Sequence, residues 1–230
     1  MEERYSRTRL LIGDEGLEKL KSKRVALFGI GGVGGFVLEG LSRSGIGEIT
    51  IFDKDKVSES NLNRQIIATI DSVGLDKVEV AKNRVNNIDD SIKVNAIKTF
   101  YLPENADTVD FSKFDYVIDA VDTVSAKISI IENAKKVGVP VISCMGTGGK
   151  LNPELLKVSC IEKTSVCPLA KVMRKKLKNR GITDVKVVYS TEEGVSAKTN
   201  SNEKIIPSMI FVPAVAGLLI ANEVVKDLLK

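Results

Sequence analysis

Apolar residues follow two different spacings along the chain, and the two spacings alternate. Short runs rich in β-branched and other apolar residues, typical of buried parallel strands, occur at 24–31, 49–53, 92–97, 115–119 and 139–143. The segments 34–44, 75–88 and 123–137 instead carry apolar residues near helical spacing. This alternation predicts a doubly wound, Rossmann-like α/β fold with a mostly parallel sheet and helices on both faces.

The last third of the chain departs from that rhythm. Strands are predicted at 155–161 and 185–189, with a helix at 169–180 between them and a closing helix at 212–229. The polar stretch 190–204 predicts a mobile surface loop. No linker divides the chain, so we expect a single domain over 1–230. Residues 1–145 would form the nucleotide-binding core, and 146–230 a partly antiparallel extension on the substrate side, with a crossover loop and the closing helix.

Composition narrows the chemistry. The chain has no histidine, which removes the most common general base and metal ligand. Its three cysteines cannot form a four-thiolate zinc site. We interpret Cys144 and Cys160 as buried apolar residues. Cys167 precedes Pro168 at a predicted helix start, where the pKa of a thiol can fall, but a catalytic thiol there is not the favoured interpretation. The longest apolar run, 210–221, is too short to span a bilayer, and no signal peptide is evident, so a cytoplasmic protein is expected.

A glycine motif predicts a nucleotide site. Residues 29–34 read GIGGVG, directly after a predicted strand and at the start of a predicted helix. Glycines there allow a tight turn and let backbone amides approach phosphates at a helix N-terminus. Asp53 ends the next strand, where an acid can bind ribose hydroxyls. Up to this point the pattern fits a nicotinamide dehydrogenase equally well, and a purely structural glycine turn remains the alternative.

Residues further along favour nucleotidyl transfer. They are Asp55, the segment NLNRQ at 61–65, Lys77, and the segment DAVD at 119–122. Arg64 and Lys77 could neutralise a triphosphate and its pyrophosphate leaving group. Asp122 follows a strand, at the edge where open α/β sheets bind ligands, and could hold a magnesium ion. The alternatives are solvated surface charges for Arg64 and Lys77, and a helix N-cap for Asp122.

These motifs, preceded by RYSR at 4–7, resemble in order and spacing the ubiquitin-activating-enzyme superfamily, which includes the bacterial activating enzymes of thiamine and molybdopterin biosynthesis. The resemblance implies that ATP lies against the glycine loop, with its ribose on Asp53 and with Mg²⁺ on Asp122. It implies that Arg7 is an arginine finger reaching into the neighbouring subunit of a homodimer. The implied loop residues are Gly29, Gly31, Gly32 and Gly34, and the implied phosphate ligands are Asn61, Arg64, Gln65 and Lys77.

Within that superfamily, the chain lacks the CxxC pairs common in enzymes that activate sulfur-carrier proteins. Four segments look like the tRNA threonylcarbamoyladenosine dehydratases: GTGGKLNP at 146–153, KT at 163–164, PLA at 168–170 and YSTE at 189–192. Those enzymes adenylate the threonyl carboxylate of a modified adenosine in tRNA, and the substrate's own carbamoyl group then closes a ring and expels AMP. Intramolecular closure requires no enzyme nucleophile, in keeping with a chain without histidine.

The basic residues of the predicted helix 169–180 indicate which kind of molecule the protein could bind. Its Lys171, Arg174, Lys175 and Lys178 fit a tRNA contact, or alternatively a solvated helix face. Adenylation of the C-terminal glycine of a ubiquitin-like or sulfur-carrier protein, with a possible relay partner, stays the main alternative function. A nicotinamide-dependent oxidoreductase and a non-catalytic nucleotide sensor also remain, and the acceptor that provokes ATP turnover would separate them.

Overall fold

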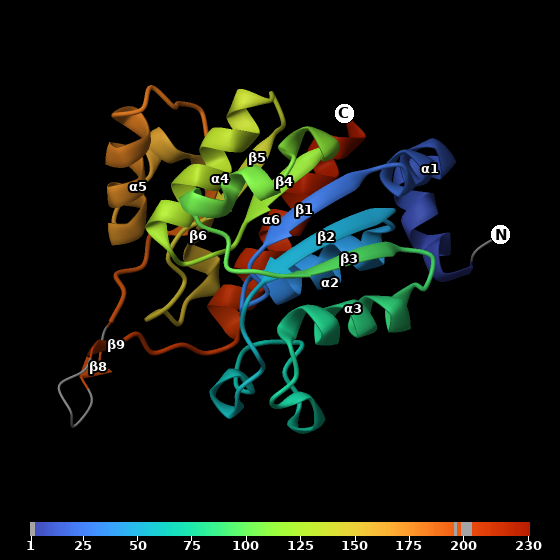
Figure 1. Ribbon diagram of the computed structural model, residues 1–230, viewed down its shortest axis with the longest axis horizontal. Helices are drawn as coiled ribbons and strands as arrows, with labels where there is room; N and C mark the ends of the chain where they lie inside the picture. Colours follow the sequence, from blue (N-terminus) through green and yellow to red (C-terminus); the bar gives the residue numbers. More distant parts are fainter. Residues whose placement is uncertain (1–2, 196, 199–203) are drawn as a thin grey trace.

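The computed structural model describes residues 3–195, 197–198 and 204–230. Seven strands form one sheet in the order β3-β2-β1-β4-β5-β7-β6 (Figure 1). Every neighbouring pair is parallel except β6 and β7, which are antiparallel. The strands are β1 (Arg24–Phe28), β2 (Glu48–Asp53), β3 (Lys93–Lys98), β4 (Tyr116–Asp119), β5 (Val141–Cys144), β6 (Leu156–Cys160) and β7 (Lys186–Ser190); β8 (Ala197–Lys198) and β9 (Lys204–Ile205) form a separate two-stranded ladder.

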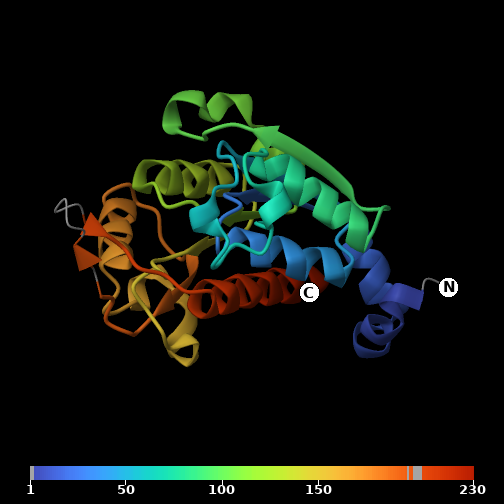
Figure 2. The same ribbon diagram turned by 90° about the horizontal axis from the view of Figure 1, so that it is seen from below.

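Helices cover both faces of the sheet. Helices α2, α3 and α6 lie side by side on one face (Figure 2), and α4 and α5 lie on the other. The helices are α1 (Ser6–Lys21), α2 (Gly34–Ser44), α3 (Lys77–Ile88), α4 (Val124–Lys136), α5 (Pro168–Lys178) and α6 (Phe211–Leu229). Short 3₁₀ turns η1–η7 occupy Glu3–Tyr5, Glu59–Asn61, Ile70–Ser72, Pro103–Thr108, Phe111–Lys113, Pro153–Leu155 and Ile161–Lys163.

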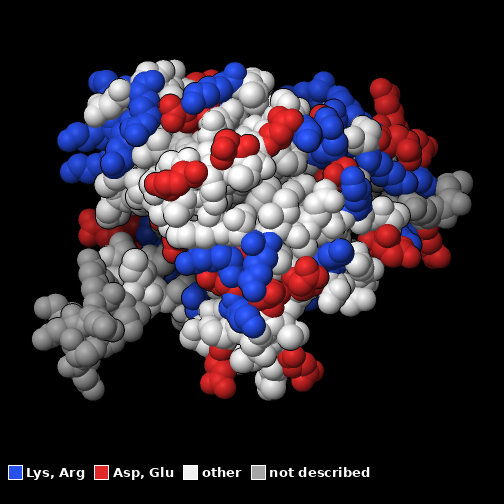
Figure 3. Space-filling view, viewed as in Figure 1, with Lys and Arg blue, Asp and Glu red and all other residues white. Residues whose placement is uncertain are grey.

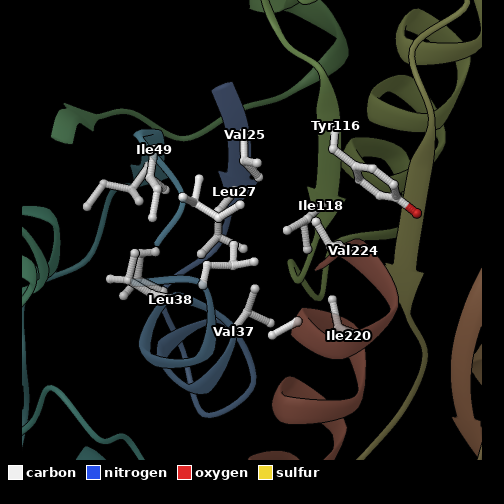
Figure 4. Packing of buried hydrophobic residues seen from close by; sticks show 14 of the residues in the cluster. Val25, Leu27, Val37, Leu38, Ile49, Tyr116, Ile118, Ile220 and Val224 are labelled. Atoms are coloured by element: carbon white, nitrogen blue, oxygen red, sulfur yellow. The ribbon is translucent and has the colours of Figure 1, made fainter. Parts of the chain in front are cut away.

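Successive side chains of β1 point to opposite faces of the sheet, so this strand contributes to the core on each face. Val25 and Leu27 belong to the core beneath α2, α3 and α6, whereas Ala26 and Phe28 belong to the core beneath α4 and α5. Figure 4 shows Val25 and Leu27 packed among side chains of α2 and α6. A strand buried on both faces is therefore apolar throughout, which is why the sequence pattern predicts it well.

Helix α6 packs closely on α2 because small residues face each other. A Cβ atom built at Gly40 would lie 2.7 Å from the Cβ of Ala221, and one at Gly217 would lie 2.5 Å from the carbonyl oxygen of Val33. Any larger residue at these positions would push the two helices apart.

Ion pairs fasten α6 to the sheet. Asp227 accepts hydrogen bonds from Lys186 of β7 at 2.6 Å and from the hydroxyl of Tyr116 at 2.9 Å. Burial alone would raise the pKa of Asp227, but the hydrogen bonds from Lys186, Lys230 and Tyr116 outweigh it and hold that pKa at about 2.

The predicted α/β class, the mostly parallel sheet and its antiparallel end are confirmed. Helix α1 is an addition that the sequence pattern does not predict. It is interrupted at Gly13, whose φ of 76° and ψ of 170° are not helical. Its second half packs on α6, where Lys19 donates to the carbonyl oxygen of Leu229 at 3.1 Å. Its first half leaves Leu10 and Leu11 exposed, with 89% and 86% relative accessibility.

The predicted loop 190–204 is described only in part. The backbone of Ala197–Lys198 pairs with that of Lys204–Ile205, and residues 196 and 199–203 lie outside the described residues. Among the residues that the structure does describe, no helix combines the length and hydropathy needed to cross a membrane.

Candidate active site

A cavity of about 460 Å³ lies at the carboxyl edge of the sheet, in the volume range typical of ligand pockets. The segments that follow β1, β2, β3, β4 and β5 all contribute to its wall, together with residues from 61–77 and from 206–213. Nine of the site residues that the family resemblance implies line it: Gly29, Gly31, Gly32, Asp53, Asn61, Arg64, Gln65, Lys77 and Asp122.

The glycine loop brings the start of α2 to the cavity. Gly29 has a φ of 89°, in the left-handed region that favours glycine. A Cβ at Gly34 would lie 1.8 Å from the carbonyl oxygen of Gly29, so only glycine lets the helix begin this close to β1. Gly34 itself does not line the cavity. At Gly31 the nearest atom to a Cβ, apart from chain neighbours, is 4.0 Å away, which leaves its backbone open to a ligand.

Asp53 is fixed at the end of β2 by backbone donors. Its Oδ2 accepts the N–H of Ile30 at 2.7 Å, and its Oδ1 accepts the N–H of Asp55 at 2.9 Å. The carboxylate is thus held against the glycine loop while each oxygen keeps a further lone pair. This position suits the binding of ribose hydroxyls.

The segment 61–65 and the start of α3 supply the cations. The Arg64 guanidinium donates to the carbonyl oxygen of Ser60 at 2.7 Å and to the side chain of Asn63 at 2.9 Å. Lys77 is 5% exposed, and its Nζ lies 3.3 Å from Oδ2 of Asp55. The buried Oε1 of Gln65 has no hydrogen-bond partner, so this wall holds two positive groups and an unsatisfied polar atom.

Asp122 is exposed at the cavity and does not cap α4. The helix begins at Val124 with Thr123 as its N-cap, and the Asp122 carboxylate accepts only a 3.3 Å hydrogen bond from the Thr123 hydroxyl. The N-cap alternative raised by the sequence is therefore wrong, and the carboxylate is available to a ligand.

A buried ion pair beneath this loop was not singled out from the sequence. Asp119 and Lys127 are both 0% exposed, and Nζ of Lys127 lies 3.0 and 3.1 Å from the two carboxylate oxygens. Lys127 also donates to the carbonyl oxygen of Val121 at 2.8 Å, and Asp119 accepts the N–H of Val121 at 3.2 Å. The hydroxyl of Ser143 on β5 donates to Asp119 at 2.5 Å. These hydrogen bonds hold both the N–H and the carbonyl oxygen of Val121, the residue before Asp122.

Arg7 lies away from the cavity of its own chain. It is exposed on α1, which ends just before β1 and so sits at the amino edge of the sheet. Any contact between Arg7 and a nucleotide would therefore have to be made in another copy of the chain.

The basic helix is α5, and its cations differ in their surroundings. Arg174 donates to the carbonyl oxygen and the hydroxyl of Thr164, at 2.9 and 2.6 Å, which ties the helix to the end of η7. Lys171, Lys175 and Lys178 are exposed. Figure 3 shows positive side chains gathered over the position of α5.

All three cysteines are free thiols. Cys144 is buried as predicted, and burial raises its pKa to about 12. Cys160 is only half-buried, which corrects the prediction for that residue: β6 is the edge strand, and the thiol donates to the carboxylate of Glu162. Cys167 is the N-cap of α5 and is 3% exposed, so it is closed to solvent.

Comparison with known proteins gives consistent matches along the whole chain. The model of the ThiF family matches residues 5–230. The tRNA threonylcarbamoyladenosine dehydratase of Bacillus subtilis (strain 168) is 42% identical over 98% of this chain and 94% of its own length. The enzyme of that name from Escherichia coli (strain K12) is 35% identical over 83% of this chain and 74% of its own.

Solved structures agree with the sequence comparison. The E. coli dehydratase TcdA in complex with AMP superposes with a TM-score of 0.90 at 32% identity, covering 98% of this chain and 93% of that one. The same enzyme in complex with ATP superposes with a TM-score of 0.87 over the same shares of the two chains.

Proposed function

The chain belongs to the ThiF family, and from that premise we propose that it is an ATP-dependent tRNA threonylcarbamoyladenosine dehydratase. It would adenylate the threonyl carboxylate of N6-threonylcarbamoyladenosine in tRNA and then close the ring with release of AMP. The observation that carries the proposal is the near full-length similarity to the dehydratase of B. subtilis. The chain would act as one domain, with 1–145 holding ATP and 146–230 facing the acceptor.

At the nucleotide end, the cavity suits ATP. The open backbone at Gly31 and the N-terminus of α2 would face phosphates, and Asp53 would bind the ribose. A phosphate has no N–H or O–H to donate to the unsatisfied Oε1 of Gln65, but its oxygens can accept hydrogen bonds from Nε2 of the same side chain. We therefore assign Nε2 of Gln65 to the phosphates. Arg64 and Lys77 would neutralise the negative charge that moves onto pyrophosphate as it leaves. Asn61, whose Oδ1 accepts the N–H of Ser58, would shape this wall.

Asp122 is the residue we propose for magnesium. Mg²⁺ is usually held by one or two carboxylates together with substrate phosphates, and Asp122 offers an exposed carboxylate in the cavity wall. When bound, the ion would draw charge from the phosphate oxygens. The buried pair of Asp119 and Lys127 would keep the Asp122 backbone in place.

The two chemical steps balance without an enzyme nucleophile. A carboxylate oxygen bonds to the α-phosphorus of ATP, and the bond from that phosphorus to pyrophosphate breaks. The carbamoyl group of the same substrate then attacks the activated carbonyl carbon, loses a proton, and displaces AMP. The acceptor thus loses the elements of water, and the lost oxygen leaves on AMP. Proximity within one substrate replaces a covalent enzyme intermediate.

The exposed lysines of α5 are the proposed tRNA contact. Lys171, Lys175 and Lys178 can release counterions from a phosphate backbone, whereas Arg174 is held by Thr164. With tRNA as acceptor, and with three free thiols typical of a reducing compartment, we keep the cytoplasm as the proposed location.

A homodimer accounts for the first half of α1. Arg7, Leu10 and Leu11 are exposed and lie at i, i+3 and i+4, so they share one helix face. An exposed apolar face that carries an arginine, followed by the helix break at Gly13, suits packing against a second copy.

Mixing inactive variants tests this arrangement. Arg7→Ala and Lys77→Ala subunits should restore part of the activity in mixed dimers, because one composite site then keeps both residues. Absence of any recovery in mixed dimers of demonstrated composition would rule out action of Arg7 across subunits.

The experiment that tests the function measures the pyrophosphate and the AMP formed from ATP and Mg²⁺ with three acceptors: threonylcarbamoyl-modified tRNA, unmodified tRNA, and a carrier protein ending in Gly-Gly. AMP formed only with modified tRNA, with a nucleoside lighter by one water, is the expected result. Turnover with the carrier protein alone would move the chain to sulfur-carrier activation. Binding of NADH without binding of ATP would overturn adenylation altogether.

A further inference from the structure

Lys150 is a buried lysine whose ammonium makes no hydrogen bond. It lies in the loop after β5, two residues beyond Gly148, which lines the cavity. The residue is 6% exposed, and its Nζ is buried with no hydrogen-bond partner. Lys77 and Lys127, the other buried lysines of the described chain, each contact a carboxylate. A buried ammonium that lacks an acceptor is unfavourable unless an anion reaches it.

The neighbouring groups do not satisfy Lys150. Burial lowers its pKa, while Cys167, Glu192 and Cys144 raise it by charge interaction. The Glu192 carboxylate is already occupied, because it accepts the N–H groups of Leu151 and Asn152 at 2.9 Å each and the side-chain amide of Asn152 at 3.0 Å. The two cysteines are buried thiols. Lys150 therefore lies near one carboxylate, that of Glu192, but its Nζ makes no hydrogen bond to it.

The order of the strands places this charge on the side of the cavity left for the acceptor. Along the carboxyl edge, β2 carries Asp53 for the ribose, β1 carries the glycine loop for the phosphates, and β4 carries Asp122. Next comes β5, whose loop contributes Thr147 and Gly148 to the wall and then continues into Lys150. A carboxylate approaching the α-phosphate from the side away from the ribose would meet this loop.

Two segments cover Lys150. The N–H of Val195 donates to the carbonyl oxygen of Gly149 at 2.8 Å, and the N–H of Gly149 donates to that of Pro207 at 2.6 Å. A Cβ at Gly194 would lie 3.8 Å from Cε of Lys150. Residues 194–195 and 206–207 thus lie over the loop, and Gly194 lies beside the Lys150 side chain. These two backbone hydrogen bonds, together with the three that Glu192 accepts from Leu151 and Asn152, hold the two segments to the loop.

We propose that the Lys150 ammonium binds the carboxylate to be adenylated, once residues 192–195 and 206–208 move off the loop to admit the acceptor. The inference rests on the proposed function and assigns its acceptor subsite. A carboxylate and an α-phosphate are both negative, so a cation beside them lowers the repulsion that opposes attack. The oxygen–phosphorus bond forms, and the bond to pyrophosphate breaks, as described above.

The test compares Lys150→Met with the wild type and with Lys113→Met, which removes a charge from a side chain that is 72% exposed on η5. For each protein we would measure the thermal midpoint, the affinity for a non-hydrolysable ATP analogue, and the affinity for modified and unmodified tRNA in the presence of that analogue. The ratio of the two tRNA affinities isolates the added threonylcarbamoyl group with its carboxylate, because the remaining RNA is common to both.

Lys150→Met is expected to lower that ratio about 10-fold or more, the usual effect of losing a hydrogen bond to a charged group, and to leave ATP-analogue binding unchanged. Its thermal midpoint should be equal to or above that of the wild type, because an unpaired buried charge is gone. Lys113→Met should leave the ratio, the analogue affinity and the thermal midpoint unchanged.

For Lys150→Met, an unaltered ratio, or a lowered midpoint with weaker analogue binding, would overturn the inference. If Lys150→Met does not fold, Lys150→Gln is measured in its place by the same criteria. A wild type that releases no AMP with modified tRNA would overturn the proposed function instead.

Discussion

Replacing Lys127 by methionine should show how much the buried ion pair beneath the Asp122 loop contributes to stability. The ammonium makes three hydrogen bonds, to both oxygens of Asp119 and to the carbonyl oxygen of Val121, at 2.8 to 3.1 Å. Methionine has nearly the same length, so little volume is lost, but the Asp119 carboxylate stays 0% exposed without its cation. Removal of one partner from a buried pair costs about 3–5 kcal/mol of unfolding free energy.

For a domain of this size, such a loss corresponds to a fall of roughly 6–20 °C in the thermal midpoint. Scanning calorimetry or circular dichroism would measure it, with Lys113→Met as the exposed control, for which no shift is expected. The double variant Asp119→Asn with Lys127→Met removes the stranded charge and should recover much of the loss. A single variant that melts within about 1 °C of the wild type, or a double variant less stable than Lys127→Met, would refute this account of the pair.

Three further predictions follow from geometry already described. Gly34→Ala should destabilise the protein strongly, because its Cβ would lie 1.8 Å from a backbone oxygen, whereas Gly31→Ala should fold normally and weaken ATP binding, as melting curves and nucleotide titrations would show. The pKa of Asp227 lies at about 2 in the folded protein, below its ordinary value of 3.8, so its stabilisation is complete above pH 4 and is lost as the pH falls towards 2; Asp227→Asn should flatten that part of the stability profile. Arg174→Ala should lower the thermal midpoint, while Lys175→Ala should keep it and reduce the salt dependence of tRNA binding.

The nucleotide half of the fold was predictable because its signals are local. The apolar run after Arg24 and the glycines after Phe28 set a strand and a helix start, and the structure has β1 and α2 there. Helix α1 was missed because Gly13 breaks it and because Leu10 and Leu11 are exposed while only Ile12 packs against the core, so the apolar residues at 10–12 do not form a buried stripe.

The buried polar groups were harder to predict. Lys127 stands in an apolar helix segment, between Ala126 and Ile128, and this was the one signal in the sequence that a charge is buried there. Nothing adjacent to Lys150 in sequence indicates that it lacks a partner. Its environment is made by Glu192 and Cys167, which come from distant parts of the chain, so only the folded geometry reveals it.

The close contact of α6 with α2 also constrains the order in which the protein can form during synthesis. The glycine loop, α2 and the first four strands all precede residue 120, but the apolar face of α2 is covered by residues 211–229, the last element of the chain. Contacts so distant in sequence form late, and until then a nascent chain would present that face to chaperones. Newly made protein should therefore gain tight ATP binding only after α6 has left the ribosome, when the Lys19 to Leu229 hydrogen bond also joins segments 210 positions apart.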